Sequence, residues 1–399
     1  PLSTTFGPLR AHTCWQSSPT YPPTQPRIHA ITHYVYNLGI LTGMSEVSAT
    51  HFSHLQHFRA HRTPDSVEFF PTSPQLENGE GLESMCAVSS YELVKDEGRR
   101  TGHLSLFDCS VLDSVKEVYS AETKGLLDSK WKPHSDALPL LASVTSAGTA
   151  EVRAVRGWEE RGSKEVEVTT LCETEEEGSL ALALEWCSKL DRQHENICVS
   201  YTSGTVAVYA YAKEALAEVW KQESAHDMEC WGVTSDEHDP HVIYTGADDC
   251  TFRGWDTRVE PAGSPTFNNR KSHTMGVCCI QTMLNDETKV LTGSYDEYVR
   301  VFDKRMMMRP VTAVRTEGGG VWRLKVMPTG HILTASMHAG TAVVDIENCT
   351  VVSLFDKHES MSYGVDFKRG GNENEPFIGA CSFYDNAIYF YSHPPLQQK

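Results

Sequence analysis

The sequence predicts an all-β protein folded as a seven-bladed β-propeller, preceded by a disordered N-terminal leader. Two observations carry this prediction: a strand-turn-strand pattern recurs seven times, and a short, mostly apolar strand stands ahead of each copy. A sheet of a few short strands cannot bury both of its faces alone, so repeats of this length must pack against each other in a ring. The 399 residues of the chain suffice for seven such units.

The repeat is clearest in two segments, YTGADDCTFRGWDTR (residues 244–258) and LTGSYDEYVRVFDKR (residues 291–305), which align position by position. Each consists of a short strand, a tight turn containing Asp, and a strand that ends on an aromatic residue and Asp. Successive turn positions are 46, 56, 46, 47, 43 and 46 residues apart, which is the period of WD repeats. The aligned turn residues are Gly102, Gly148, Gly204, Cys250, Glu297, Gly340 and Asn386.

Each copy is preceded by one further strand, so a unit contains two to four strands and no convincing helix. The preceding strands are SVEFF, DSKWKP, LALEWCS, CWGVTS, VCCIQT, VWRLKV and YGVDFK. The seventh unit ends after three strand-like segments, which leaves an unpaired edge. Residues 52–62, which alternate in polarity just before the first unit, are predicted to supply the missing outer strand.

The N-terminal segment differs in composition from the repeats. Residues 1–64 contain no Asp, no Lys and one Glu, but seven of the 18 His and seven of the 19 Pro. Low charge, no lasting period and a Pro-rich stretch are typical of linkers and disordered segments. We therefore expect a disordered leader over residues 1–51, a propeller over residues 52–392 and a tail over residues 393–399.

The charge balance restricts the classes of partner. The net charge is −18, and residues 65–399 alone carry 52 acidic against 31 basic side chains, or −21. This acidity argues against nucleic acid, whose phosphates need Lys and Arg, and the chain lacks the long apolar run of a membrane span. Twelve scattered cysteines without a CxxC pair are typical of reduced thiols, so a cytoplasmic location is expected.

Several His and Asp residues of the repeats have a structural explanation. In WD repeats a His, a Ser or Thr, an Asp and a Trp form a hydrogen-bonded set, which satisfies polar groups that would otherwise be buried unpaired. The fourth unit has all four members, and they are predicted to be structural: His226, Thr245, Asp249 and Trp255. The fifth unit has His273, Thr292 and Asp296, but Phe302 replaces the Trp donor.

The sequence contains none of the common catalytic motifs. It has no serine elbow, phosphate-binding loop, dinucleotide fingerprint or HExxH helix, and no cofactor or metal is expected. The loops around one end of a propeller channel form a recognition surface in many such folds, although each residue there also has an ordinary packing role. The candidates on this surface are Asp248, Met275, Cys278, Tyr295, Trp322, Arg323, Tyr363 and Tyr384.

Three segments go beyond the general WD pattern. These are GADDCTFRGWDTR with KSHTMGVCCIQ, then GGGVWRLKVMPTG with SMHAG, and finally ACSFYDNAIYFY; DSVEFFP (residues 65–71) adds weaker support. Together they resemble the diphthine methylesterase family, the WD-repeat factors of diphthamide biosynthesis, over about residues 225–391. The resemblance implies hydrolysis of the methyl ester of methylated diphthine on elongation factor 2, with that factor and possible further proteins of the diphthamide pathway as partners.

Ester hydrolysis requires an activated nucleophile, a proton acceptor and donors to the oxyanion. Two arrangements are open: Cys278 attacks with a nearby His as base, or a His-Asp pair activates water, for which His273 with Asp296 is the preferred pair. His338, out of pattern at a turn, is a second candidate base, and Arg323 is a candidate either for holding the carboxylate side of the substrate or for stabilising the oxyanion. The predicted substrate-binding residues are Asp248, Tyr295, Trp322, Tyr363 and Tyr384. The alternative function is a non-catalytic WD-repeat adaptor that holds protein complexes together.

Overall fold

The computed structural model describes residues 51–71, 84–133, 138–157, 165–187, 195–261, 263–316, 318–369, 372 and 374–396. All of the expected leader except His51, and the last three residues of the expected tail, lie outside the described residues. Within the described part every regular element is a β-strand, and the strands form seven antiparallel sheets of four. No helix in this part is long and apolar enough to cross a membrane.

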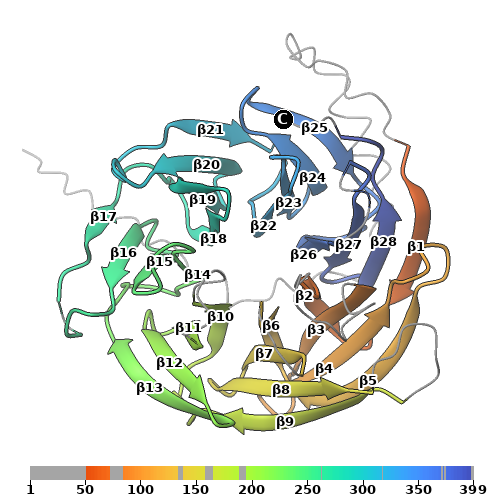
Figure 1. Cartoon of the computed structure of the whole chain (residues 1–399), viewed down its shortest axis with the longest axis horizontal. Coiled ribbons are helices and arrows are strands. Elements are labelled where there is room, and N and C mark those ends of the chain that lie inside the picture. Colours follow the sequence, from red (N-terminus) through yellow and green to blue (C-terminus); the bar gives the residue numbers. More distant parts are fainter. Residues whose placement is uncertain are drawn as a thin grey trace, which may run out of the picture. The chain divides into compact units, whose positions relative to one another are not determined.

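The seven sheets follow each other around a ring in chain order, and each is one blade (Figure 1). Blades one to three, each from its inner to its outer strand, are β2 (Thr63–Phe69), β3 (Met85–Val94), β4 (Arg99–Asp108), β5 (Lys116–Lys124); β6 (Leu126–Trp131), β7 (Leu140–Thr145), β8 (Ala150–Arg156), β9 (Glu167–Glu173); and β10 (Ala181–Trp186), β11 (Asn196–Tyr201), β12 (Val206–Ala212), β13 (Ala215–Gln222).

Blades four to seven continue the same order. They are β14 (Gly232–Ser235), β15 (Val242–Gly246), β16 (Phe252–Asp256), β17 (Phe267–Asn269); β18 (Val277–Met283), β19 (Asp286–Ser294), β20 (Tyr298–Asp303), β21 (Thr312–Arg315); β22 (Arg323–Val326), β23 (Ile332–Ser336), β24 (Gly340–Asp345), β25 (Thr350–Phe355); and β26 (Ser362–Phe367), β27 (Phe377–Ser382), β28 (Ala387–Ser392), β1 (Ser53–Arg59). The seven-bladed propeller predicted from the repeat spacing is therefore confirmed.

The hydrophobic core lies between neighbouring blades. Blade one, for example, packs Phe70 and Leu104 against Leu126 and Trp131 of blade two, and all four side chains are buried. Removing such a side chain from water stabilises the fold by about 1.5 to 3 kcal/mol. The inner strands also contact each other around the whole ring, including β2 with β26. Many side chains of the inner strands are apolar because they pack against a neighbouring blade.

The turn predicted in each repeat is present in six blades. The aligned residues of blades two to seven all have positive φ, from 55° at Asn386 to 100° at Gly340, so each occupies the left-handed turn position. The aligned residue of blade one, Gly102, was placed wrongly. It lies inside β4, because β3 and β4 form a longer hairpin whose turn residue with positive φ is Gly98.

The ring is closed by strand β1 from the N-terminal side of the propeller. It pairs antiparallel with β28, which is the last strand of the chain, and so covers the edge of blade seven (Figure 1). Two aromatic side chains anchor this segment. Phe52 packs edge-on against Tyr391 and Phe58 against Phe107, with centroid distances of 5.1 and 5.2 Å. The segment at residues 52–62 therefore has the position that the unpaired seventh unit requires.

Candidate active site at the mouth of the central channel

Each inner strand presents one irregular residue where it begins. In five blades the pairing between inner and second strand skips a residue, which is a β-bulge, and in blades four and six a Trp precedes the inner strand at the same position of the repeat. A bulge turns a side chain out of the regular sheet pattern, and bulges are frequent beside active sites. We call these seven residues the rim ring: Asp65, Leu127, Leu182, Trp231, Cys278, Trp322 and Tyr363.

Aromatic packing joins the rim ring across blades four, six and seven. Trp322 stacks on Tyr363 with a centroid distance of 4.7 Å and lies 5.2 Å from Trp231 and 5.7 Å from Tyr295. Tyr384 continues this group outward, and 70% of its surface is exposed. The structure thus brings together Tyr295, Trp322 and Tyr363 of the predicted substrate-binding residues and leaves Tyr384 accessible at the edge.

Two glycines of the motifs singled out in the sequence permit this packing. A Cβ on Gly276 would lie 2.4 Å from Oδ1 of Asp248, and a Cβ on Gly320 would lie 2.7 Å from Cα of Tyr295. Side chains at either position would push Asp248 or Tyr295 away from the rim. Burial raises the pKa of Asp248 to about 6, although a hydrogen bond from Trp231 opposes that shift. Asp248 therefore stands beside the rim ring, and its role in substrate binding stays a prediction.

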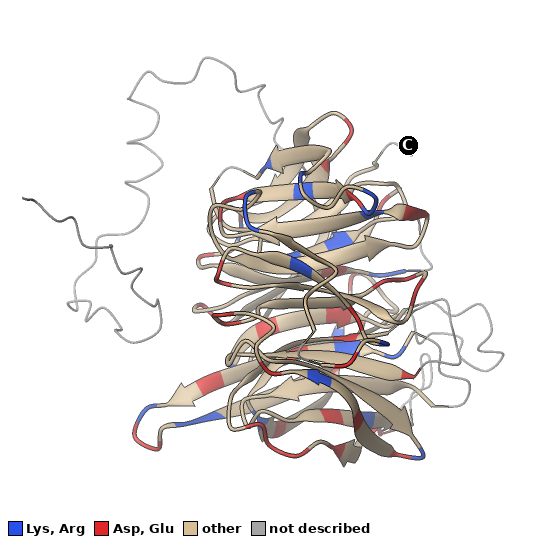
Figure 2. Cartoon of the chain, turned by 90° about the vertical axis from the view of Figure 1, so that its left-hand side faces the viewer, with Lys and Arg blue, Asp and Glu red and all other residues tan. Residues whose placement is uncertain are grey.

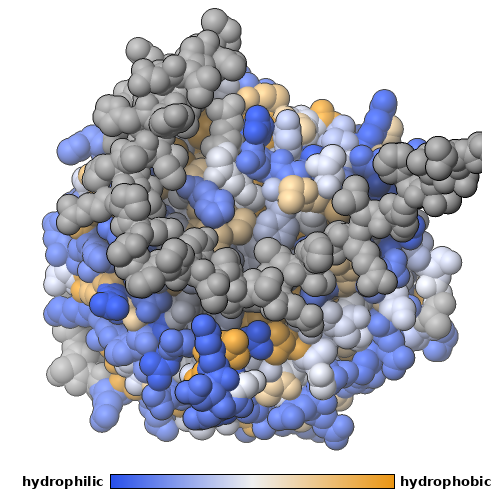
Figure 3. Space-filling model, turned by 180° about the vertical axis from the view of Figure 1, so that it is seen from behind, coloured by the Kyte–Doolittle hydropathy of each residue, from blue (hydrophilic) through white to orange (hydrophobic). Residues whose placement is uncertain are grey.

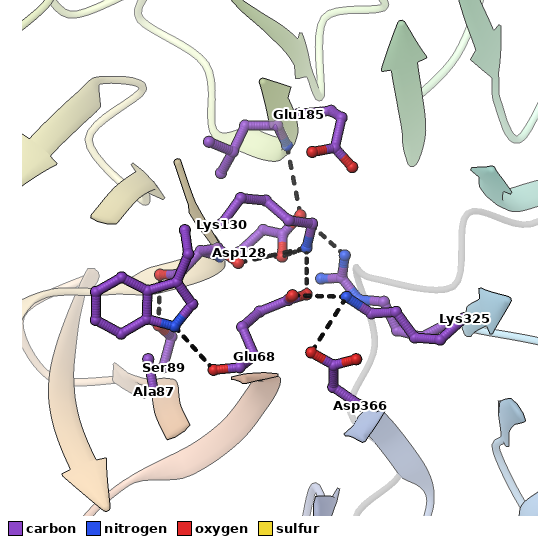
Figure 4. A network of polar contacts seen from close by, with 12 residues as sticks. Glu68, Ala87, Ser89, Asp128, Lys130, Glu185, Lys325 and Asp366 are labelled. Carbon is purple, nitrogen blue, oxygen red and sulfur yellow. Dashed lines mark hydrogen bonds and ion pairs between the residues drawn. The ribbon is translucent and has the colours of Figure 1, made fainter. Parts of the chain in front are cut away.

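A set of charged side chains fills the channel below the rim ring. Figure 4 shows them converging on the ring centre from β2, β6, β22 and β26. Glu68 accepts hydrogen bonds from Lys130 and from Lys325, each at 2.6 Å, and Asp128 pairs with Arg323 at 2.9 Å. We call this set the channel network: Glu68, Asp128, Lys130, Arg323, Lys325 and Asp366.

The channel network links blades that are not neighbours in the ring. Asp128 belongs to blade two and Arg323 to blade six, so their ion pair spans the channel. Burial acts to raise the pKa of Glu68, but Lys130 and Lys325 outweigh burial and hold this pKa below its usual range. The charged side chains of the channel network are therefore held in ion pairs below the rim ring.

Asp65 is the least well paired acid of the rim ring and of the channel network. It is 4% exposed, and its Oδ1 has no hydrogen-bond partner among the described residues. Its Oδ2 lies 3.8 Å from Nη2 of Arg323, whose stronger partner is Asp128. Burial raises the pKa of Asp65 to about 7, with Arg323 opposing the shift and Asp128 adding to it. A carboxylate of this kind can take up and release a proton near neutral pH.

The predicted His273–Asp296 pair is not formed. Nε2 of His273 bonds to Oγ1 of Thr292 at 2.9 Å, and Nδ1 has no partner in the described part of the chain. Both carboxylate oxygens of Asp296 instead accept hydrogen bonds from Arg300 at 2.8 Å. Burial lowers the pKa of His273 to about 3, so its ring is neutral, and Phe302 packs beside it. The sequence hypothesis overlooked Arg300, which takes the carboxylate that the histidine would need.

The other three predicted catalytic residues are Cys278 in β18, His338 in the turn after β23, and Arg323 in β22. Cys278 belongs to the rim ring but is 5% exposed, and burial raises the pKa of its thiol well above the usual value, so the thiolate is disfavoured. His338 is exposed on the turn between β23 and β24. No hydrogen bond between Cys278 and a histidine occurs among the described residues. Of the predicted catalytic residues, Arg323 lies nearest to Asp65.

The four residues predicted to be structural in blade four form one hydrogen-bonded chain. Nε2 of His226 bonds to Oγ1 of Thr245 at 2.7 Å, Nδ1 lies 3.1 Å from Asp249, and the indole of Trp255 donates to Thr245 at 2.9 Å. Arg253 also donates to Asp249, at 3.2 Å. All polar atoms of this set are engaged within the blade, which leaves them no part in a reaction at the channel.

Sequence reasoning missed all four acids of the rim ring and the channel network, which are Asp65, Glu68, Asp128 and Asp366. Asp65 and Glu68 lie three residues apart in DSVEFF, an otherwise apolar inner strand, and that placement was the available signal. An acid on an inner strand must be paired or must face the channel. Glu68 is paired and Asp65 is only weakly so. The comparison of the seven rim-ring positions, five of which are bulged, singles out Asp65, and it requires the strand register.

Comparisons with known proteins agree with this architecture. The family described as "WD domain, G-beta repeat" matches residues 265–303. The chain is 28% identical over 374 residues to the diphthine methyltransferase homolog of Dictyostelium discoideum, covering 82% of this chain and 95% of that protein. It is 30% identical to diphthine methyltransferase of Mus musculus, covering 78% of this chain and 69% of that protein. The WD40 propeller domain of Doa1 superimposes with a TM-score of 0.62 and 14% identity over 86% of this chain and 97% of that one, which supports the fold alone.

Proposed function

Because this chain belongs to the diphthine methyltransferase family, we propose that it acts on diphthine and removes the methyl ester from methylated diphthine on elongation factor 2. The products would be methanol and a free carboxylate. The observation that carries the proposal is the mouth of the channel. There the rim ring combines stacked aromatic side chains with one weakly paired carboxylate, Asp65, and the guanidinium of Arg323 lies 3.8 Å from that carboxylate.

The groups available at the mouth support this reaction class. Ester hydrolysis by water needs a proton acceptor and donors to the oxyanion, and it needs neither a nucleotide nor a redox group. Asp65 can accept a proton near neutral pH, while Trp322 and Arg323 carry N–H groups without an acceptor among the described residues. The exposed aromatic ring of Tyr384 suits the methylated, cationic side chain of diphthine, since cations bind to aromatic faces.

The surface of the propeller fits a large protein substrate. Acidic and basic residues are interspersed along the strands and loops on the side seen in Figure 2, and hydrophobic residues occur in small groups among hydrophilic ones on the face seen in Figure 3. The excess of acids over the repeats, −21, would attract a basic region of the translation factor and steer its approach. Recognition would then combine charge attraction with insertion of the modified side chain at the rim.

The test uses the purified chain and elongation factor 2 that carries methylated diphthine. We expect one methanol per modified factor, together with the loss of one CH2 unit from the modified residue by mass spectrometry. Unchanged mass with a stable complex would contradict hydrolysis and identify a non-catalytic adaptor. A substrate that carries the free carboxylate serves as control, because it should bind without change of mass.

A further inference from the structure

We propose that Asp65 is the general base of the reaction, which removes a proton from the attacking water while Arg323 holds the carboxylate in place. This inference rests on the proposed ester hydrolysis and names the group that performs it. It follows from a comparison among the seven blades, because the repeat places an equivalent residue at the mouth of the channel in each.

The repeat supplies the structural reason to single out Asp65. Six members of the rim ring are apolar, aromatic or Cys, and they belong to the blade packing or to the aromatic group. Asp65 occupies the same bulged position in blade one, between Pro64, which pairs with Ser90, and Ser66, which pairs with Ser89. A buried carboxylate at this position makes the folded state less stable than an apolar side chain would. Residues that lower stability in this way are typical of functional sites.

The contacts of Asp65 leave it available for chemistry. The channel network binds its own acids tightly, with Glu68 held by two lysines at 2.6 Å each. Asp65 has a single cation 3.8 Å from one oxygen, and its other oxygen is buried without a partner among the described residues. Asp65 also lies close enough to Tyr91 for its charge to raise the pKa of that phenol, second only to burial. The carboxylate is therefore buried near Tyr91 and only weakly paired, so it remains able to accept a proton.

In the proposed step, Asp65 takes one proton from water and passes it to the leaving methoxy group. The water oxygen forms a bond to the ester carbonyl carbon as one of its protons passes to Asp65, and the carbonyl electron pair moves onto the oxygen. The buried N–H groups of Arg323 and Trp322 are donors that can stabilise this oxyanion. The intermediate then expels the methoxy group, which takes the proton from Asp65 and leaves as methanol. The product acid loses its proton to solvent, and Asp65 is regenerated as a carboxylate.

The experiment compares single-turnover hydrolysis by the wild-type chain, Asp65→Asn and Asp113→Asn, with binding of elongation factor 2 and melting temperature measured in parallel. Asp113 is the matched control, since it is an exposed acid of the same blade that pairs with His54. We expect Asp65→Asn to bind the factor and to remain folded but to hydrolyse about 10² to 10⁴ times more slowly. Asp113→Asn should match the wild type.

The pH dependence separates a base from a merely structural residue. The wild-type rate should rise through the pKa of Asp65, about 7, and level off above it, because the base must be deprotonated. The rate of Asp248→Asn should show the same rise with pH, even if the affinity of this variant for the substrate falls. The inference would be overturned if Asp65→Asn hydrolysed the ester at an unchanged rate, or if its loss of rate were explained by unfolding. It would also be overturned if the rise of the rate with pH disappeared in Asp248→Asn. If the wild-type protein releases no methanol, the proposed hydrolysis is wrong, and so is the role of Asp65 as its general base.

Discussion

Replacing Asp65 by Asn should stabilise the protein, and the gain should depend on pH. Asp65 is buried, and its pKa is raised from 3.8 to about 7 in the folded protein. The folded state therefore holds a proton that the unfolded chain releases, so between these two pH values the stability of the wild type falls as pH rises. Asn carries no charge and removes this penalty while keeping nearly the same shape.

The magnitude follows from the difference between the two pKa values. That difference corresponds to a penalty of about 4 kcal/mol above pH 7, at 1.36 kcal/mol for each tenfold change in acidity. At lower pH Asp65 is protonated in the folded protein, so less of this penalty applies. The difference in free energy of unfolding between Asp65→Asn and the wild type should therefore grow by about 2 to 3 kcal/mol between about pH 5 and pH 8. The lost contact with Arg323 at 3.8 Å subtracts little, because the stronger partner of Arg323 is Asp128.

Urea unfolding of both proteins at the two pH values measures this difference directly, since the midpoint shifts with stability when the slope is unchanged. Asp113→Asn should show no such pH-dependent gain, because Asp113 is exposed. An equal stability difference at both pH values would refute the reasoning. It would show that Asp65 is ionised in the folded protein at low pH, and therefore that the carboxylate is better paired than its contacts indicate.

Further predictions follow from the same contacts. Glu68→Ala should lower the free energy of unfolding by about 3 to 5 kcal/mol, measured by urea denaturation, because two buried lysines lose a partner. His273→Ala should cost about 1 to 3 kcal/mol through its lost bond to Thr292, while the folded fraction retains hydrolytic activity; a large loss of rate at unchanged stability would restore the histidine as a catalytic candidate. Tyr384→Ala should weaken binding of elongation factor 2 by about 1 kcal/mol or more in titration calorimetry, whereas Val219→Ala, on outer strand β13, should not. Raised salt should slow association with the factor in stopped-flow measurements, and a rate independent of salt would remove the charge-steering argument.

The fold was predictable because seven copies of the repeat each indicate the same arrangement of strands. Seven copies with regular spacing, each with an apolar inner strand, leave few other ways to bury the sheets. The turn of blade one escaped prediction because its hairpin is longer, which moves the turn from Gly102 to Gly98. Local patterns place strands well, but they do not determine the length of a hairpin whose turn departs from the consensus.

The site was less predictable because it depends on contacts between distant segments. The aromatic group and Arg323 could be placed near the channel mouth from their positions in the repeat. The pairing of Asp296 with Arg300 was visible only as an i, i+4 spacing across a turn, and the same arrangement recurs for Asp249 and Arg253 in blade four. Asp65 became conspicuous only when strand register aligned it with the apolar residues of the other blades.

The central claim is that water attacks the ester carbonyl of methylated diphthine at the mouth of this propeller. Single-turnover hydrolysis in water enriched in heavy oxygen tests it most directly, with mass spectrometry of both products. The account predicts that one heavy oxygen enters the new carboxylate of diphthine and none enters methanol. Heavy oxygen in methanol, or no conversion of the ester by the folded wild-type protein, would contradict it.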